Sequence, residues 1–250
     1  MAAQYIDTVR FTRLIDTPLA SRLRLPSVCA ICHGWGVQRV CAACSDRFAP
    51  RVARCERCAL AVPTGVRLCG ICVTSPPPFE RSVAALDYAP PWSELIARFK
   101  FQAALDLAPV LAEQVAAAVR HDAASGAELI LPVPLSTRRL RERGYNQAWE
   151  LARRVARERH VPADAHLLLR IKDTPHQLAL APAQRAGNVR AAFAVEPLRR
   201  AELVGRRIAL VDDVMTTGAT AAELARVLLQ AGAAQVQVWV VARTPRPAER

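Results

Sequence analysis

The chain has few lysines, few aromatic residues and no long apolar run. Lysine occurs only at positions 100 and 172, and aromatic residues make up 5% of the sequence. Proteins that bind single-stranded nucleic acid without sequence preference stack bases on aromatic side chains, so this low content argues against a dedicated protein of that class. A membrane-spanning helix needs about 20 consecutive apolar residues, and the lack of such a run predicts no membrane insertion.

The first 25 residues also lack the continuous apolar core of a secretory signal peptide. They scatter aspartate and arginine among their apolar residues instead. We therefore expect a cytoplasmic protein. Because that compartment is reducing, its cysteines are more often metal ligands than partners in disulfide bonds.

Arginine gives the chain a strongly basic balance. The formal net charge is +12, which favours anionic partners such as nucleic acid, nucleotides or phosphorylated metabolites. The hydrophobic content of 52% and the charged content of 22% are ordinary for a globular protein. A length of 250 residues is enough for one α/β domain and a small additional module.

All eight cysteines lie between positions 29 and 72, as four Cys-x-x-Cys pairs. A two-residue gap lets a tight turn direct both sulfurs at one ion, and two such turns complete a closed, structural four-sulfur site. Thioredoxin-type redox pairs do not come four at a time. Short spacers favour pairing in sequence order over a cross-braced arrangement, but spacing alone leaves both open. We expect two zinc ions, held by Cys29, Cys32, Cys41, Cys44, Cys55, Cys58, Cys69 and Cys72.

The rest of the chain alternates short apolar runs with amphipathic helical patterns. Strands that alternate with helices predict an α/β fold, in which helices cover both faces of a parallel sheet. The predicted strands lie at about 82–89, 128–135, 206–213 and 234–243, and the predicted helices at about 105–119, 145–159 and 219–231.

The segregated cysteines and the Pro76-Pro77-Pro78 run predict separate modules. A proline run forms a stiff, extended linker. The predicted organisation is an N-terminal extension (1–28), a double zinc ribbon (29–73), a proline-rich linker (74–78), the α/β domain (79–244) and a short tail (245–250).

Residues 208–220 read IALVDDVMTTGAT and directly precede a predicted helix. A helix N-terminus presents free N–H groups and a positive dipole end to a phosphate. Acids at the carboxyl end of a buried strand can accept hydrogen bonds from sugar hydroxyls. The chain contains neither a GxxxxGK[ST] nor a GxGxxG motif. The candidate phosphate and sugar ligands are Asp212, Asp213, Thr216, Thr217, Gly218, Ala219 and Thr220.

This run resembles the phosphoribosyl-pyrophosphate (PRPP) signature of type I phosphoribosyltransferases, namely four apolar residues, two acids and then T-T-G-x-T. The wider chain resembles the ComF/GntX family of bacterial competence proteins. Besides this run and the cysteine pairs, the resemblance rests on FKF at 99–101, PVPL at 132–135, RRLRERGYNQA at 138–148, DTPHQ at 173–177 and QRAGNVRAAF at 184–193. The resemblance implies a double zinc ribbon before a type I phosphoribosyltransferase fold, which binds PRPP with Mg²⁺. It also implies transfer of a phosphoribosyl group to an unidentified acceptor, linked to DNA uptake or processing.

Two further groups of residues are candidates for the pyrophosphate and for a hood over PRPP. Guanidinium groups match phosphate oxygens in pairs, and an arginine cluster directly follows PVPL. The alternative for this cluster is a solvated helix face. By resemblance only, a proline-broken stretch downstream supplies the hood. The candidates are Arg138, Arg139, Arg141, Arg143, Asn146, Gln147, Thr174, Gln177, Arg185 and Asn188.

The catalytic residues stay unassigned, because Thr216 stands where several nucleobase-salvage enzymes have an aspartate as general base. A threonine cannot act as a general base at neutral pH. Two alternatives to an enzyme therefore stay open: a module that senses PRPP without turnover, and an adaptor for single-stranded DNA or a protein of the competence machinery. The sequence leaves the acceptor and the oligomeric state open.

Overall fold

The computed structural model describes residues 26–122, 126–172 and 191–246. The chain divides into two compact units, Met1–Ser45 and Asp46–Arg250, which are described separately. The second unit therefore contains the second group of four cysteines together with the α/β sheet. The predicted module boundaries themselves stay a prediction.

The first unit is built around the first four cysteines. Its strands β1 (Ser27–Val28) and β2 (Trp35–Gly36) pair antiparallel, and helix α2 (Ala42–Phe48) begins in this unit. Little apolar material is available here, so a metal ion is the expected source of stability.

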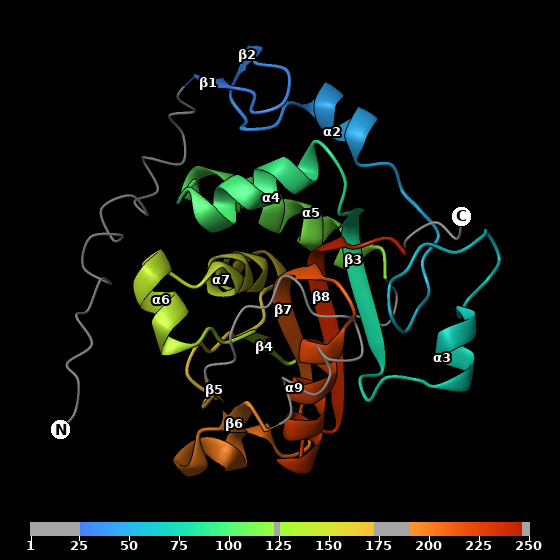
Figure 1. Cartoon of the computed structure of the whole chain (residues 1–250), viewed down its shortest axis with the longest axis vertical. Helices are drawn as coiled ribbons and strands as arrows, with labels where there is room; N and C mark the ends of the chain where they lie inside the picture. Colours follow the sequence, from blue (N-terminus) through green and yellow to red (C-terminus); the bar gives the residue numbers. More distant parts are fainter. Residues whose placement is uncertain (1–25, 123–125, 173–190, 247–250) are drawn as a thin grey trace. The chain divides into compact units, whose positions relative to one another are not determined.

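The second unit is organised around a four-stranded parallel sheet in the order β3-β8-β7-β4, which confirms the predicted α/β architecture (Figure 1). The two inner strands are almost entirely buried, as expected for a sheet covered on both faces. All four strands lie where the apolar runs predicted them. Their bounds are β3 Arg81–Asp87, β4 Leu129–Pro132, β7 Arg207–Met215 and β8 Gln235–Arg243.

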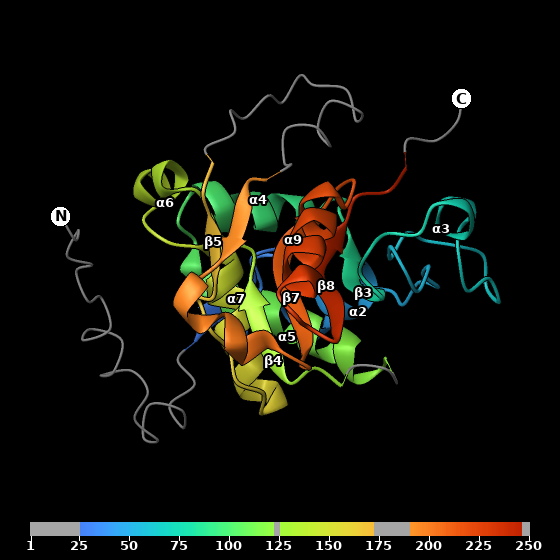
Figure 2. The same ribbon diagram turned by 90° about the horizontal axis from the view of Figure 1, so that it is seen from below.

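Helices cover both faces of this sheet (Figures 1 and 2). Helices α5 (Ala108–Arg120) and α7 (Gln147–Arg159) pack against each other and against one face. Helix α9 (Ala219–Gln230) packs against β8 from the opposite face. The predicted start of α5 at Leu105 is wrong: Leu105 lies in a 3₁₀ turn, η1 (Leu105–Leu107), and is 40% exposed, because Pro109 suits the first turn of the α-helix proper.

The remaining elements lie around the sheet. Helix α3 (Gly70–Thr74) belongs to the second cysteine group, and α4 (Trp92–Phe101) follows β3. Helix α6 (Thr137–Arg143) follows β4, and the 3₁₀ helix η2 (Pro197–Leu203) precedes β7.

Two short strands, β5 (Leu168–Arg170) and β6 (Phe193–Val195), pair antiparallel and come before and after the predicted hood in the sequence. The hood candidates Thr174, Gln177, Arg185 and Asn188 lie outside the described residues. Within the described residues, no helix combines the length and the apolarity needed to cross a bilayer.

Candidate functional site

The loop between β7 and α9 has the geometry of a phosphate site. Gly218 is the N-cap of α9, and its φ of +82° lies in the left-handed region that favours glycine. No side chain caps this helix end, apart from a 3.3 Å hydrogen bond that the Ala219 N–H donates to Thr217 Oγ1 within the loop. The N–H groups of the first turn and the positive end of the helix dipole are therefore available to an anion.

A small pocket lies over this loop and the adjoining strand end. Asp212 lines it from β7, and Val133, which directly follows β4, lines it from the neighbouring strand. The Val133 N–H donates to the Val211 carbonyl at 2.9 Å, so the PVPL segment lies beside the acidic pair at one edge of the sheet. Of the residues predicted to bind PRPP, the pocket is lined by Asp212, Thr216, Thr217, Gly218, Ala219 and Thr220.

Asp213 does not line this pocket, since consecutive side chains of a strand point to opposite faces. The Asp213 side chain is only 3% exposed, and its Oδ2 lies 2.7 Å from Nζ of Lys100. Burial and the Asp213 carboxylate raise the pKa of Asp212 well above its ordinary value. The two acids thus have different environments, although the sequence suggested one shared role.

Lys100 is the functional candidate that the sequence analysis did not single out. It lies near the end of α4, and its side chain is 23% exposed. Burial opposes its charge, but the carboxylates of Asp213 and Asp212 raise the pKa of Lys100 above its ordinary value. Two signals were available: lysine is rare in this arginine-rich chain, and Lys100 is the central residue of the FKF run at 99–101 that contributes to the family resemblance.

The structure distinguishes the arginines of α6 from one another. Arg143 lies 5.5 Å above the ring of Phe101, next to Lys100, and its charge acts on that lysine. Arg138 is 66% exposed and pairs with Glu142 on the same helix. Arg139 and Arg141 also lie on α6, which has no buried residue. Arg143 therefore acts on Lys100, the partner of Asp213, whereas Arg138 fits the alternative of a solvated face.

Asn146 and Gln147 support the local structure. The Asn146 side chain accepts a hydrogen bond from the Ala148 N–H at 3.0 Å, which caps α7, and donates to the Val133 carbonyl at 3.2 Å. Gln147 is buried and accepts a hydrogen bond from Arg143. Asn146 thereby ties the start of α7 to the segment that lines the pocket.

The eight cysteines form two separate clusters, each made of two neighbouring pairs. In each cluster the four sulfurs lie within 4.8 Å of one another. The pairing in sequence order is thus confirmed, and the cross-braced arrangement is excluded. The clusters are Cys29, Cys32, Cys41 and Cys44, in the first unit, and Cys55, Cys58, Cys69 and Cys72, in the second.

The distances within the clusters suit a tetrahedral ion. Metal–sulfur bonds of about 2.3 Å in a tetrahedron separate the sulfurs by about 3.8 Å. The sulfurs of Cys32 and Cys41 are 3.8 Å apart, and those of Cys58 and Cys69 are 3.6 Å apart. Backbone N–H groups also donate to the sulfurs, which is the usual environment of a metal-bound thiolate. Both clusters could hold a metal ion.

The pKa values of the thiols indicate which of them would need a metal ion to stabilise the thiolate form. Burial would raise the pKa of Cys29, but backbone N–H groups, foremost that of Cys32, lower it to about 6. The same balance, with the Cys69 N–H as the main donor, lowers the pKa of Cys55 to about 7. Burial and the neighbouring sulfurs raise the pKa of Cys44 to about 12. One thiolate thus forms readily and the last is opposed by its neighbours, a repulsion that a divalent cation removes.

Two of the solved structures similar to this chain have names that refer to PRPP or to phosphoribosyl transfer. The glutamine PRPP amidotransferase from B. subtilis shares 21% identity at a TM-score of 0.35, over 52% of this chain and 25% of that one. The adenine phosphoribosyltransferase from Leishmania donovani shares 17% identity at a TM-score of 0.34, over 56% and 53%. At these scores the likeness carries no weight for substrate or mechanism.

Curated relatives match almost the whole chain, whereas no protein-family model matches it. The DNA utilization protein YhgH of Escherichia coli K12 is 36% identical over 233 residues, which cover 89% of this chain and 99% of that protein. Competence protein F of Haemophilus influenzae is 35% identical over 193 residues, which cover 76% and 84%. The two four-cysteine clusters, the parallel sheet and these relatives agree, and the chain belongs to the ComF family of competence proteins.

Proposed function

We propose that this protein binds PRPP with Mg²⁺ at the loop between β7 and α9 and transfers its phosphoribosyl group to an acceptor. The observation that carries this proposal is one pocket lined by both Asp212 and the first turn of α9. The names of the relatives, DNA utilization protein and competence protein, support a role in bacterial DNA uptake or processing. We propose a cytoplasmic location for this role.

In this proposal the 5′-phosphate of PRPP binds at the N-terminus of α9. The N–H groups of the first turn donate to its oxygens, and Thr216, Thr217 and Thr220 add hydroxyl donors from the pocket wall. The Asp212 carboxylate accepts hydrogen bonds from the ribose hydroxyls, which would lower its raised pKa because those donors favour the charged form.

The pyrophosphate would be bound by cations from two helices. Arg143 supplies a guanidinium group from α6, and Lys100 an ammonium group from α4. Mg²⁺ bound together with PRPP would neutralise charge on the pyrophosphate leaving group. Lys100 of α4 and the residues of the loop would therefore contribute to one site, although more than a hundred residues separate Lys100 from Asp213 in the sequence.

Both cysteine clusters would hold zinc. Four thiolates complete the coordination of each ion, so these ions would be structural and take no part in the reaction. Metal binding and folding are one equilibrium in such modules.

The second candidate function is a PRPP-binding module without turnover. It is favoured by Thr216, which is exposed at the position two residues before Gly218 and offers a hydroxyl and no carboxylate as base. An acceptor that needs no deprotonation is the alternative. A third candidate function is an adaptor for single-stranded DNA or a partner protein, which the net charge of +12 supports.

A thermal-shift titration with Mg²⁺ and PRPP tests binding, and assay of pyrophosphate release over a panel of acceptors tests turnover. A ligand at 100 times its Kd stabilises the native state by about 2.7 kcal/mol, which raises the melting temperature measurably. Asp212→Asn, Asp213→Asn and Gly218→Val should abolish the shift. Glu94→Gln, a charge loss at an exposed position of α4, is the matched control and should keep it. An undiminished shift in all three variants refutes the proposed site.

A further inference from the structure

Arg243 links the second cysteine cluster to the phosphate loop. It is the last residue of β8, and only 5% of it is exposed. Its Nε donates to the carbonyl of Cys58 at 2.8 Å, within the second cluster. Its terminal nitrogen donates to the carbonyls of Met215, at 3.0 Å, and Thr216, the residues that end β7 and begin the loop. One guanidinium group therefore spans the two sites.

A second path runs through Phe79. The side chain of Arg57, which precedes Cys58, donates to the Phe79 carbonyl at 3.1 Å. The Phe79 ring is buried, and its tip lies 4.0 Å from the point that a Cβ on Gly218 would occupy. The turn between Cys55 and Cys58 is thus linked to the loop indirectly, through Arg243 at the start of the loop and through Phe79 beside its glycine.

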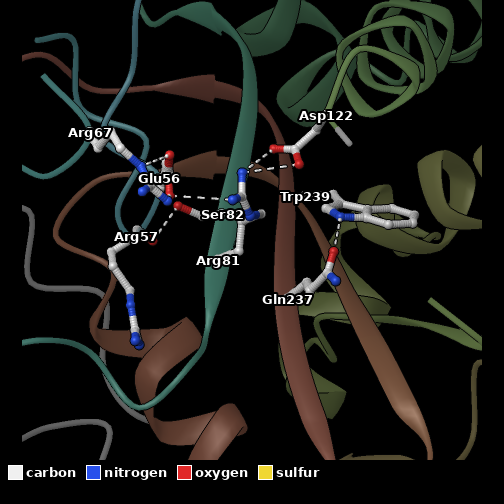
Figure 3. A network of polar contacts seen from close by, with 8 residues as sticks. All are labelled: Glu56, Arg57, Arg67, Arg81, Ser82, Asp122, Gln237 and Trp239. Carbon is white, nitrogen blue, oxygen red and sulfur yellow. Dashed lines mark hydrogen bonds and ion pairs between the residues drawn. The ribbon is translucent and has the colours of Figure 1, made fainter. Parts of the chain in front are cut away.

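The same turn is anchored on the edge strand β3 (Figure 3). Ser82 donates from its N–H to the Glu56 carbonyl at 3.0 Å and from its hydroxyl to the Arg57 carbonyl at 2.6 Å. Glu56 also pairs with Arg81 at 3.4 Å. The turn is therefore held by β3, and its Cys58 carbonyl and Arg57 side chain bind Arg243 and the Phe79 carbonyl.

We infer that Arg243 is a positioning residue, which makes metal occupancy of the second cluster and ligand occupancy of the phosphate loop depend on each other. An ion fixes the Cys55–Cys58 turn and with it the Cys58 carbonyl. Arg243 then holds the Met215 and Thr216 carbonyls, so the loop keeps the backbone that a phosphate needs. The inference rests on the proposed function for the identity of the ligand.

The coupling must act in both directions, because it is a free energy shared by two binding equilibria. PRPP should therefore tighten zinc binding at the second cluster. Because affinity differences between related complexes lie mostly in the dissociation rate, it should also slow the loss of zinc from that cluster. The first cluster provides an internal comparison, since none of its cysteines is among the partners of Arg243.

The test measures zinc release from the full chain to a chromogenic chelator, with Mg²⁺ present throughout and with or without PRPP. Wild type should release two zinc ions per chain, and PRPP should slow one of the two phases about 5-fold or more, the lower end of typical coupling. A Cys29→Ser/Cys32→Ser variant, which retains only the second cluster, should keep the PRPP-sensitive phase. Equal rates with and without PRPP, in a sample whose melting temperature PRPP raises, overturn the inference and leave the proposed function intact.

Variants separate positioning from simple support of the fold. Arg243→Met should remove the effect of PRPP on zinc release, and Arg243→Lys should restore part of it. Arg207→Met is the matched control: it removes an arginine at the opposite end of the sheet and should leave the PRPP effect unchanged. If Arg243→Met does not fold, the lysine variant decides. A wild-type PRPP effect in that variant overturns the role of Arg243.

A loop variant tests the coupling without PRPP. Gly218→Val strains a position with a φ of +82° and moves side-chain atoms toward Phe79 and Met215. It should speed zinc release from the second cluster and leave the first unchanged. An unchanged rate from the second cluster overturns the inference even if PRPP proves not to be the ligand.

Discussion

Replacing each of the two neighbouring acids by asparagine should change the stability of the ligand-free protein in opposite directions. Asp213→Asn removes the partner of Lys100, whose ammonium group lies 2.7 Å away, with side chains 3% and 23% exposed. Breaking a buried ion pair costs about 3–5 kcal/mol, and the partial exposure of Lys100 reduces this to about 2–3 kcal/mol. Lys100 would keep only its longer-range attraction to the Asp212 carboxylate.

Asp212→Asn should instead stabilise the ligand-free protein. Burial and the Asp213 carboxylate disfavour its charge and raise its pKa, so the neutral amide relieves a repulsion while nearly keeping the shape. We expect a gain of about 0.5–2 kcal/mol, which is typical of a single stabilising substitution, together with loss of PRPP binding.

Urea unfolding at several pH values measures both effects. Because the folded pKa of Asp212 is above its unfolded value of 3.8, wild type loses stability as the pH rises from 3.8 through the folded pKa. The gain from Asp212→Asn should therefore be absent at pH 3.8 and below and should grow as the pH rises. The Lys100 pKa is above its ordinary 10.5, so the contribution of the lysine is complete at pH 7. Equal losses in the two variants, or a gain from Asp212→Asn that does not depend on pH, would refute the assignment of different environments.

Two further predictions concern the arginines and the metal. Arg143→Ala should weaken PRPP binding about 10-fold, as expected for the loss of one charge-assisted hydrogen bond, whereas Arg138→Ala should have little effect. Single-stranded DNA should bind weakly to both variants and to wild type, with an affinity that falls steeply as the salt concentration rises. Titration with a labelled oligonucleotide at two salt concentrations measures this affinity. A selective loss of DNA affinity in Arg143→Ala would favour the adaptor function. Elemental analysis should find two zinc ions per chain. A single zinc ion, with four thiols that react with an alkylating agent in the native protein, would show that one of the two clusters does not bind zinc.

Features that depend on neighbouring residues could be predicted from the sequence. The four Cys-x-x-Cys pairs predicted both clusters, because each cluster is formed by two consecutive turns. The apolar runs predicted every strand of the parallel sheet, and IALVDDVMTTGAT predicted the loop before α9. In each case the interaction is local, or the hydrophobic pattern is long enough to specify the element.

The way in which distant segments complete the site depends on the tertiary structure and could not be predicted. The different environments of Asp212 and Asp213 depend on α4 bringing Lys100 to one side of β7, and nothing near the acids in the sequence encodes that contact. The link between the second cluster and the loop joins Arg243 to Cys58 across 185 positions. Such contacts depend on which strand ends share one edge of the sheet, since β3, β7 and β8 end side by side at Asp87, Met215 and Arg243. This register is a property of the assembled sheet, because hydrogen bonds between strands specify it and the pattern of any single segment does not.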